Sequence, residues 1–279
     1  MKHHTTFRVG GPAEYYLRPK KEQVAEVLRL CLTYQKEYLI IGNGSNLLVS
    51  DKGISGVVIE IGKQMDEITV DGTTIYAQAG AMLSKTAHAA LEAGLTGMEF
   101  AAGIPGCVGG AVVMNAGAYG GEMKDILKSV TVLTADGQEK ELTPGELDMS
   151  YRHSSITEEH YMVLGVTIAL EAGSQEQIRA KMEELKEKRV EKQPLEYPSA
   201  GSTFKRPEGY FAGKLIMDAG LRGFQVGGAA VSEKHCGFVI NRGNATAADV
   251  RTLMQNVADI VEEKFGVRLE PEVKMIGEF

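Results

Sequence analysis

The chain has 279 residues, of which 43% are hydrophobic and 24% are charged, and its formal net charge is −7. This composition is typical of a globular protein with two or three domains. The acidic balance excludes an electrostatic case for a nucleic-acid partner, because nucleic acids are bound by basic surfaces. We also expect neither a signal peptide nor a membrane span, because no apolar run approaches membrane length.

The cysteines and histidines favour a cytoplasmic protein that holds no metal. Cys31, Cys107 and Cys236 are odd in number, widely spaced and outside any CxxC pair. This pattern favours reduced thiols over a disulfide framework or a zinc site. The neighbouring His3 and His4 have no further ligand at a metal-binding spacing, so we expect no metal centre.

Residues 1–63 predict a small α/β unit with the order strand, helix, strand, strand. The buried strands are expected at residues 38–41 and 57–60. A helix from Lys20 is indicated by apolar side chains at positions i, i+3, i+4 and i+7, which are Val24, Val27, Leu28 and Cys31.

A first glycine-rich loop, residues 41–46 (Ile-Gly-Asn-Gly-Ser-Asn), follows the first of these buried strands. Its Gly-x-Gly pattern, together with Glu60, is similar to a dinucleotide-binding Rossmann unit. That motif needs a third glycine, where Leu47 stands, and a helix directly after the glycines. Residues 45–56 show no helical stripe, so the pattern favours a different fold for binding a flat ligand.

A second bare stretch, residues 101–121, is rich in glycine and alanine and carries no charge. Taken alone, it indicates either tightly packed core turns or a cradle for a large, flat ligand. Glycine lets a backbone N–H group approach a ligand closely. Because two such stretches occur, the sequence favours one extended ligand, held by N–H groups of the kind that bind pyrophosphate oxygens.

The region around this second stretch alternates between strands and helices. A hairpin is expected within residues 64–80, because Asp71 and Gly72 form a strong turn signal. Further elements are predicted as a helix over 82–93 that Gly94 ends, strands over 128–133 and 161–170, and a capped, solvated helix over 174–193 with Ile178, Met182 and Leu185 as its apolar stripe.

Pro194 and Pro198 interrupt the chain and predict a domain boundary. The following domain is expected to hold a helix near 210–219, strands over 225–231 and 237–241, a long helix that Thr246 caps with Asp249 and Gly266 ends, and a strand over 269–276.

Three polar spots lie among turn and strand residues, and each has a plain structural alternative. Arg152, after Tyr151, offers a planar fork for a carboxylate or phosphate, the alternative being a surface ion pair. Ser202, after Gly201, can present its hydroxyl to a cleft, the alternative being an ordinary loop turn. Glu272 follows a proline that fixes the backbone, the alternative being an exposed edge strand.

In combination, the motifs of this chain resemble the UDP-N-acetylenolpyruvoylglucosamine reductase family. The matching motifs appear in order over nearly the whole chain, at residues 6–13, 42–46, 103–106 continuing to 115–120, 150–152, 200–204 and 269–273.

The resemblance implies an α+β protein with an FAD-binding fold of the vanillyl-alcohol-oxidase type and a smaller α+β substrate domain. It implies a division into FAD-binding subdomain 1 (1–63), FAD-binding subdomain 2 (64–194), a substrate-binding domain (195–268) and a C-terminal strand that carries Glu272 (269–279). The short connection between residues 121 and 150 is similar to the family's second type, which lacks a long tyrosine-bearing loop.

The resemblance also implies FAD and NADPH as cofactors and a UDP-sugar enolpyruvyl ether as substrate, with no obligate protein partner evident. The residues it implies for FAD are Ile41, Gly42, Asn43, Gly44, Ser45, Asn46, Gly103, Ile104, Pro105, Gly106, Gly109, Gly110, Asn115, Ala116, Gly117 and Ala118.

For catalysis the resemblance implies Arg152, Ser202 and Glu272. Their chemistry fits reduction of an enolpyruvyl group. Arg152 is suited to stabilise the negative charge that develops on the carboxylate side. Ser202 is suited to supply a proton to the carbon next to the methylene carbon that is reduced. Tyr151, Arg152, Ser202, Lys205 and Lys214 are expected at the substrate, and Arg206 and Arg222 are further candidates for its diphosphate.

Two other functions remain open at this point. One is a flavin oxidase of the same fold that acts on an alcohol or a sugar. Such enzymes often attach FAD through a histidine, and neither glycine-rich stretch contains one. The other is a nucleotide-sugar-binding module without catalytic activity, which would leave Ser202 and Glu272 without a role.

Overall fold

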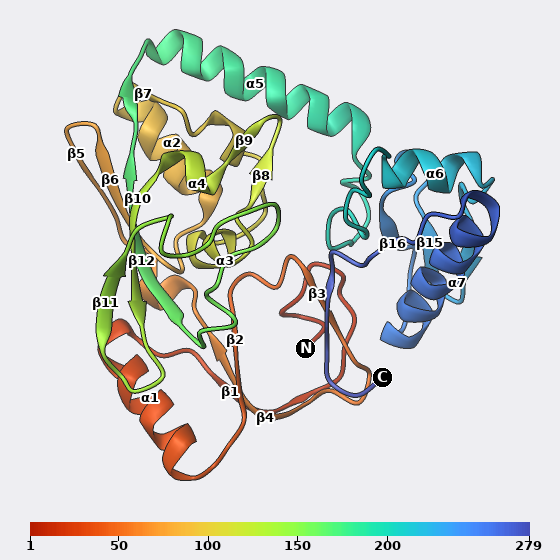
Figure 1. Cartoon of the computed structure of the whole chain (residues 1–279), viewed down its shortest axis with the longest axis horizontal. Coiled ribbons are helices and arrows are strands. Elements are labelled where there is room, and N and C mark those ends of the chain that lie inside the picture. The colour runs from red at the N-terminus through yellow and green to blue at the C-terminus, as the bar shows by residue number, and fades with distance from the viewer. The chain divides into compact units, whose positions relative to one another are not determined.

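The computed structural model describes residues 1–279, and the chain divides into two compact units (Figure 1). Unit 1 consists of Met1–Tyr15, Gly44–Ser55 and Val190–Phe279, and unit 2 of Tyr16–Asn43 and Gly56–Arg189. The finer division into three domains and a C-terminal strand stays a prediction.

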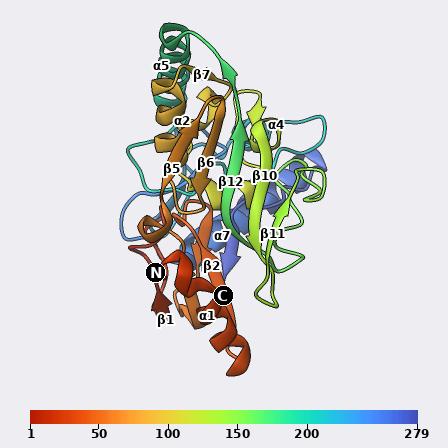
Figure 2. The same ribbon diagram turned by 90° about the vertical axis from the view of Figure 1, so that its left-hand side faces the viewer.

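Unit 2 is built on a five-stranded antiparallel sheet with the order β11-β10-β12-β6-β5 (Figure 2). Its strands are β5 (Ile68–Asp71), β6 (Thr74–Gln78), β10 (Leu127–Leu133), β11 (Glu139–Leu142) and β12 (Met162–Ala169). The hairpin turn at Gly72 has φ +56°, as the sequence pattern predicts. The edge strand β11, which follows the turn at Gly137, is an element that the sequence analysis did not predict.

Helices and short strands pack beside this sheet in unit 2. The helices are α2 (Leu83–Glu92), α3 (Val108–Val113), α4 (Met123–Ile126) and α5 (Gln175–Lys192), with 3-10 turns at Lys63–Met65 and Glu99–Ala101. The short strands are β7 (Leu95–Thr96), β8 (Gly117–Ala118), β9 (Gly121–Glu122) and β13 (Glu171–Ala172). Gly94 follows α2 with φ +69°, and the predicted stripe of α5 is buried, so both helix predictions are confirmed.

A second sheet, with the order β1-β4-β2, is formed by β1 (Ala13–Leu17), β4 (Ile54–Glu60) and β2 (Tyr38–Ile41). Within unit 2, β2 and β4 are parallel, and β2 delivers the chain into the first glycine-rich loop. The connecting helix α1 (Lys21–Thr33) buries Val24, Leu28 and Cys31. The helical spacing read from the sequence is therefore confirmed.

Unit 1 has its own core, in which α7 (Ala247–Phe265) and α6 (Ala212–Asp218) pack with a small antiparallel sheet. That sheet contains β14 (Gln225–Val226), β15 (Ala229–Val231) and β16 (Val239–Asn241). The Thr246 Oγ1 atom accepts the Asp249 N–H at 3.0 Å, and Gly266 ends α7 at φ +67°, both as predicted.

Two strand predictions in unit 1 need correction. The single strand expected over 225–231 is a hairpin, because Gly227 adopts φ +54° and reverses the chain. The strand expected over 269–276 is shorter: β17 (Lys274–Ile276) pairs in parallel with β3 (Leu47–Val49), and Glu272 lies before it. Pro271, which lacks an N–H donor, stands in the part that forms no regular ladder.

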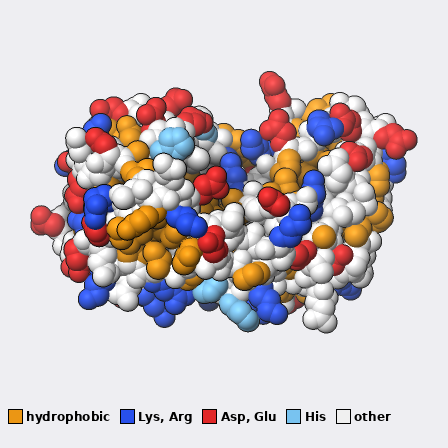
Figure 3. Space-filling model, turned by 90° about the horizontal axis from the view of Figure 1, so that it is seen from below, with side chains coloured by type: hydrophobic (Ala, Val, Ile, Leu, Met, Phe, Trp, Pro, Cys, Tyr) orange, Lys and Arg blue, Asp and Glu red, His pale blue; other side chains and the backbone are white.

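The surface shows neither a membrane-spanning element nor a metal cluster. None of the helices combines the length and the apolar character that crossing a bilayer requires. No group of three metal-ligating side chains comes together. Acidic and basic side chains are interspersed on the face drawn in Figure 3, so neither sign dominates that face.

Candidate functional site

Within unit 2, the start of the first glycine-rich loop lies against the second glycine-rich stretch. The Asn43 side-chain amide donates to the Pro105 carbonyl at 2.7 Å. A Cβ atom on Gly42 would lie 2.1 Å from the Cys107 Sγ atom, so the contact leaves room for no side chain at this position. Two stretches that are far apart in sequence therefore form one region with few side chains.

The glycines of the second stretch do not all have the same reason to be glycine. A Cβ on Gly109 would lie 2.9 Å from the Ala79 Cβ, and its N–H donates to the Ala79 carbonyl at 2.8 Å. Tight packing therefore explains Gly109. Gly110 is exposed, and a Cβ there would meet the Cys107 Sγ at 3.6 Å, which is ordinary contact. Packing inside the protein leaves Gly110 unexplained, whereas close approach of a ligand would explain it.

We expect Gly42→Ala to lower the free energy of unfolding by about 1–3 kcal/mol, the usual effect of overpacking a filled site. The physical reason is the 2.1 Å approach of the new Cβ to the Cys107 Sγ atom. Urea unfolding measures the change. The double variant Gly42→Ala/Cys107→Ala should lose less stability than the sum of the two single variants, because the clash is then absent. Simple additivity would contradict the contact.

The Tyr151-Arg152 pair lies at the tip of a tight turn in unit 2. Ser150 and His153 exchange two backbone hydrogen bonds of 3.2 Å, which close the turn. Arg152 has φ +56°, a left-handed conformation that is uncommon for a residue with a side chain. Its Nη2 donates to the Gly117 carbonyl at 3.1 Å, and its guanidinium carbon lies 5.1 Å from the centre of the Tyr151 ring. The turn therefore aims a preoriented guanidinium beside the second glycine-rich stretch.

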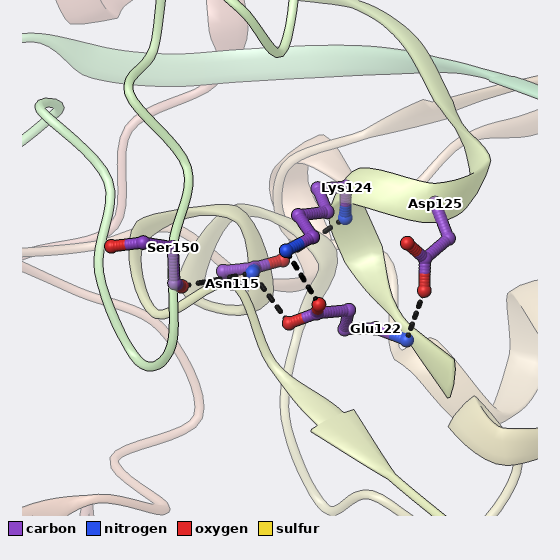
Figure 4. A network of polar contacts seen from close by, with 5 residues as sticks. All are labelled: Asn115, Glu122, Lys124, Asp125 and Ser150. Carbon is purple, nitrogen blue, oxygen red and sulfur yellow. Dashed lines mark hydrogen bonds and ion pairs between the residues drawn. The ribbon is translucent and has the colours of Figure 1, made fainter. Parts of the chain in front are cut away.

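A polar network around the buried side chain of Asn115 supports this turn (Figure 4). The Asn115 Nδ2 atom donates to the Glu122 carboxylate at 2.8 Å and to the Ser150 carbonyl at 2.9 Å. The Asn115 Oδ1 atom accepts the Lys124 N–H at 3.0 Å. Glu122 also pairs with the Lys124 ammonium at 2.7 Å, and its own N–H donates to Asp125 at 3.0 Å.

Ser202 and Glu272 belong to neighbouring segments of unit 1. The Glu272 N–H donates to the Thr203 carbonyl at 2.8 Å. Thr203 is fully buried, and its hydroxyl accepts the Val239 N–H at 2.8 Å. Ser202 itself is exposed, between this anchored residue and Gly201, which has φ +77°. The Ser202 side chain is therefore open to solvent, while the segment that carries it is firmly anchored.

The end of the first glycine-rich loop also belongs to unit 1, where it holds the segment of Glu272. The Asn46 side-chain amide donates to the Glu272 carbonyl at 3.1 Å, and the Lys274 N–H donates to the Asn46 carbonyl at 2.9 Å. On its other side, the Gly44 carbonyl accepts the Thr6 N–H at 3.2 Å. Gly44 has φ +62°, and a Cβ there would lie 2.0 Å from the His4 carbonyl oxygen. Glycine is therefore required at position 44.

The basic residues expected at the diphosphate are engaged with other groups of unit 1. Lys205 pairs with Glu270 at 3.2 Å, and Lys214 pairs with Asp218 at 2.8 Å. The Arg222 guanidinium donates to the Glu233 carbonyl, and the Arg206 guanidinium lies 4.0 Å from the centre of the Phe211 ring. These contacts are exposed and contribute little to stability, so replacing them with contacts to an anionic ligand costs little free energy.

Comparison with known proteins supports the family resemblance that the sequence motifs indicate. The family described as UDP-N-acetylenolpyruvoylglucosamine reductase, C-terminal domain, matches residues 193–276, and the family described as FAD binding domain matches residues 13–143. A UDP-N-acetylenolpyruvoylglucosamine reductase from Agathobacter rectalis is 60% identical over 100% of this chain and 93% of its own length. This chain belongs to the UDP-N-acetylenolpyruvoylglucosamine reductase family.

Other members of the reductase family agree in sequence and in structure. A protein of this name from Clostridium perfringens is 54% identical over 99% of this chain and 91% of its own length. The crystal structure of the reductase from Thermus caldophilus has a TM-score of 0.85, with 37% identity, over 99% of this chain and 97% of that chain. The predicted family and the predicted FAD-binding α+β fold are therefore confirmed.

Arg189 also lies at the second glycine-rich stretch, although the sequence analysis did not single it out as a site residue. A Cβ on Gly103 would lie 3.2 Å from the Arg189 Cδ atom, so this side chain lies against the glycine. Burial lowers the pKa of the Arg189 guanidinium, and the nearby Tyr119 partly offsets this effect. Sequence reasoning treats Arg189 as part of a solvated helix face, and no local pattern distinguishes it from its charged neighbours.

Proposed function

We propose that this chain is an FAD-dependent, NADPH-oxidising enzyme that reduces UDP-N-acetylglucosamine enolpyruvate to UDP-N-acetylmuramate in peptidoglycan precursor synthesis. The observation that carries the proposal is the 60% identity to a reductase of this name over the entire chain. The oxidase alternative has no comparable support. A cytoplasmic location is consistent with three cysteines that are all free.

The residues in unit 2 fit FAD. The Asn43–Pro105 contact brings residues 42–43 to residues 105–107, and this region is uncharged and nearly bare of side chains. Gly110 is exposed and has no packing reason to lack a side chain. Backbone N–H groups in such a region are suited to a flat ring system and to pyrophosphate oxygens. We infer that residues 41–46, 103–106, 109–110 and 116–118 hold the cofactor, and that the buried Asn115 side chain acts instead through its hydrogen bonds to Glu122 and Ser150.

FAD, when bound, would supply the redox chemistry, which carries two electrons from NADPH to the enolpyruvyl double bond. We infer that Arg152 binds the carboxylate of the enolpyruvyl group and stabilises the negative charge that develops there. Support comes from its orientation: the Gly117 carbonyl and the Tyr151 ring hold the guanidinium in place before any substrate binds. Preoriented charge of this kind lowers a barrier without reorganisation.

We infer that Ser202 gives a proton to the carbon next to the one that is reduced. A serine hydroxyl is a weak acid, but it is adequate toward an enolate-like group when it is held in place. The buried anchor at Thr203 and the exposure of the Ser202 side chain support this role.

Glu272 is assigned to the same carboxylate or to the orientation of its partners. It lies on the segment that Thr203 and Asn46 hold from either side, through hydrogen bonds of 2.8 and 3.1 Å. Because Ser202 directly precedes Thr203, movement of one of these residues would disturb the other. Tyr151, Lys205 and Lys214 are assigned to substrate binding.

The test of the proposed function is the spectrum and turnover of the purified protein. We expect a yellow protein whose FAD is released by denaturation, because binding through backbone groups involves no covalent bond. NADPH should bleach the flavin absorbance, and UDP-N-acetylglucosamine enolpyruvate should restore it under anaerobic conditions.

A colourless protein that takes up no added FAD would remove the flavoenzyme function. Bleaching of the flavin by an alcohol or a sugar and recovery of its absorbance with oxygen, without recovery by the enolpyruvyl substrate, would favour the oxidase alternative instead.

A further inference from the structure

We propose that Asn115 is a positioning residue of the reduction: its buried amide fixes the turn from Ser150 to His153 and, through that turn, the guanidinium of Arg152. The inference rests on the proposed function, because Arg152 is assigned there to the substrate carboxylate. Asn115 does not touch the reacting atoms in this arrangement and acts through the turn.

The first step is the local structure of Asn115, which ends α3. The Asn115 N–H donates to the Val112 carbonyl at 3.0 Å, and the Ala116 N–H donates to the Ala111 carbonyl at 2.8 Å. This is the hydrogen-bond pattern of a Schellman motif, in which the residue after the C-cap is left-handed. Asn115 has φ +40°, and asparagine tolerates this conformation better than most residues with a side chain. Helix termination alone would be served as well by glycine.

The second step is the use of the Asn115 side chain. The side chain is fully buried, and its two amide hydrogens are accepted by the Glu122 carboxylate and the Ser150 carbonyl. An asparagine amide has no further hydrogens to donate. The resemblance described above places Asn115 with the cofactor, but these donors are committed to Glu122 and Ser150. The hydrogen bond to the Ser150 carbonyl is the contact that connects the Asn115 amide to the turn of Arg152.

The third step is the turn itself, which needs support because Arg152 is in a left-handed conformation at φ +56°. Such conformations are unfavourable and persist only where the surroundings determine them. One end of the turn is held by the Asn115 amide at the Ser150 carbonyl. The other end is held by the Ser154 hydroxyl, which is buried and donates to the Val113 carbonyl at 2.9 Å. Both anchors come from the end of α3.

The consequence is that α3 positions both the second glycine-rich stretch and the turn that carries Arg152. Its first turn carries Gly109 and Gly110 of the second glycine-rich stretch, and its last residues hold the turn of Arg152. A change at Asn115 should therefore move the guanidinium relative to the cofactor-binding stretch, and leave that stretch itself in place.

The variant that isolates this role is Asn115→Gly, because glycine keeps the left-handed helix end and removes the side chain. We expect normal FAD occupancy and near-normal reduction of the flavin by NADPH. Oxidation of the reduced flavin by UDP-N-acetylglucosamine enolpyruvate should slow about ten- to a hundredfold, as for the loss of a buried hydrogen bond to a carbonyl. Stopped-flow absorbance of the two half-reactions measures both rates.

Two further single variants define the cause. Asn115→Asp keeps the size and the preference for positive φ but loses both amide donors, so it should slow the same half-reaction at least as much. Lys124→Ala is the matched control, since it keeps the backbone N–H that Asn115 accepts and removes only the partly exposed ion pair to Glu122. It should stay within about twofold of the parent protein, because such pairs contribute little.

The decisive measurement is a double-mutant cycle with Arg152→Ala. If Asn115 acts through Arg152, Asn115→Gly should slow the substrate half-reaction in the Arg152→Ala background by less than about twofold. Multiplicative losses would overturn the proposal, as would equal slowing of both half-reactions or loss of FAD in Asn115→Gly. Full activity of Asn115→Gly would reduce the residue to a helix terminator. Failure of the parent protein to reduce the enolpyruvyl substrate would instead overturn the proposed function.

Discussion

Ser202→Ala is expected to slow oxidation of the reduced flavin by the enolpyruvyl substrate by a factor on the order of 10² or more, as for the loss of a positioned general acid. Reduction of the flavin by NADPH should stay near its normal rate, because that half-reaction needs no proton at a substrate carbon. Ser202→Cys, which keeps a transferable proton, should slow the substrate half-reaction less than alanine does. Stopped-flow absorbance separates the two half-reactions.

The structure makes Ser202→Ala a clean test. The Ser202 side chain is exposed, and the fold of its segment depends on the Thr203 backbone and hydroxyl, which the substitution does not touch. Alanine should therefore leave stability and FAD occupancy unchanged. Should both half-reactions slow equally, or neither, Ser202 would be an ordinary turn residue after Gly201.

Arg152→Lys is expected to slow the same half-reaction by about 10² to 10³, the usual effect of removing one preoriented donor from a charge-stabilising site. Lysine keeps the positive charge but lacks the planar fork. In this structure the fork donates to the Gly117 carbonyl at 3.1 Å while its face lies over the Tyr151 ring. An ammonium group cannot hold that carbonyl and present a second, coplanar N–H to a carboxylate.

Arg18→Lys is the matched control for this substitution. Arg18 also lies over a nearby tyrosine ring, at 5.5 Å from the centre of Tyr16, and pairs with the Glu60 carboxylate at 3.1 Å. It is mostly exposed and belongs to no proposed site, so its replacement should leave turnover unchanged. Near-normal turnover of Arg152→Lys would mean that the contacts of Arg152 are those of a surface side chain.

Elements with a strong local pattern could be predicted from the sequence. The apolar spacing of α1, the capping box of α7 and the turn glycine after β5 each depend on residues close together in the chain. The errors have local causes too. Gly227 split an expected strand into a hairpin, and the short helix α3 was missed because a glycine-rich run carries no helical stripe.

The candidate site was predictable in its residue types but not in its partners. Arg152, Ser202 and Glu272 stand out as polar residues among turns, and the resemblance to a family assigns them roles. The contact of Arg189 with Gly103 links positions that are far apart in the chain, and nothing near either residue indicates it. Such pairings depend on how helices and sheets pack, which local patterns do not encode.

The sequence by itself determined that two stretches lack side chains and that Arg152 lies between two strands, because glycine content and strand patterns are local properties. Only the structure shows that Arg152 lies in a tight turn. Tertiary structure alone decided why each glycine is needed: Gly42 packs against Cys107, whereas Gly110 is open. It also decided that Asn115 holds the carbonyl of Ser150, 35 residues away. The physical reason is that a buried amide needs partners from whichever segment the core brings beside it.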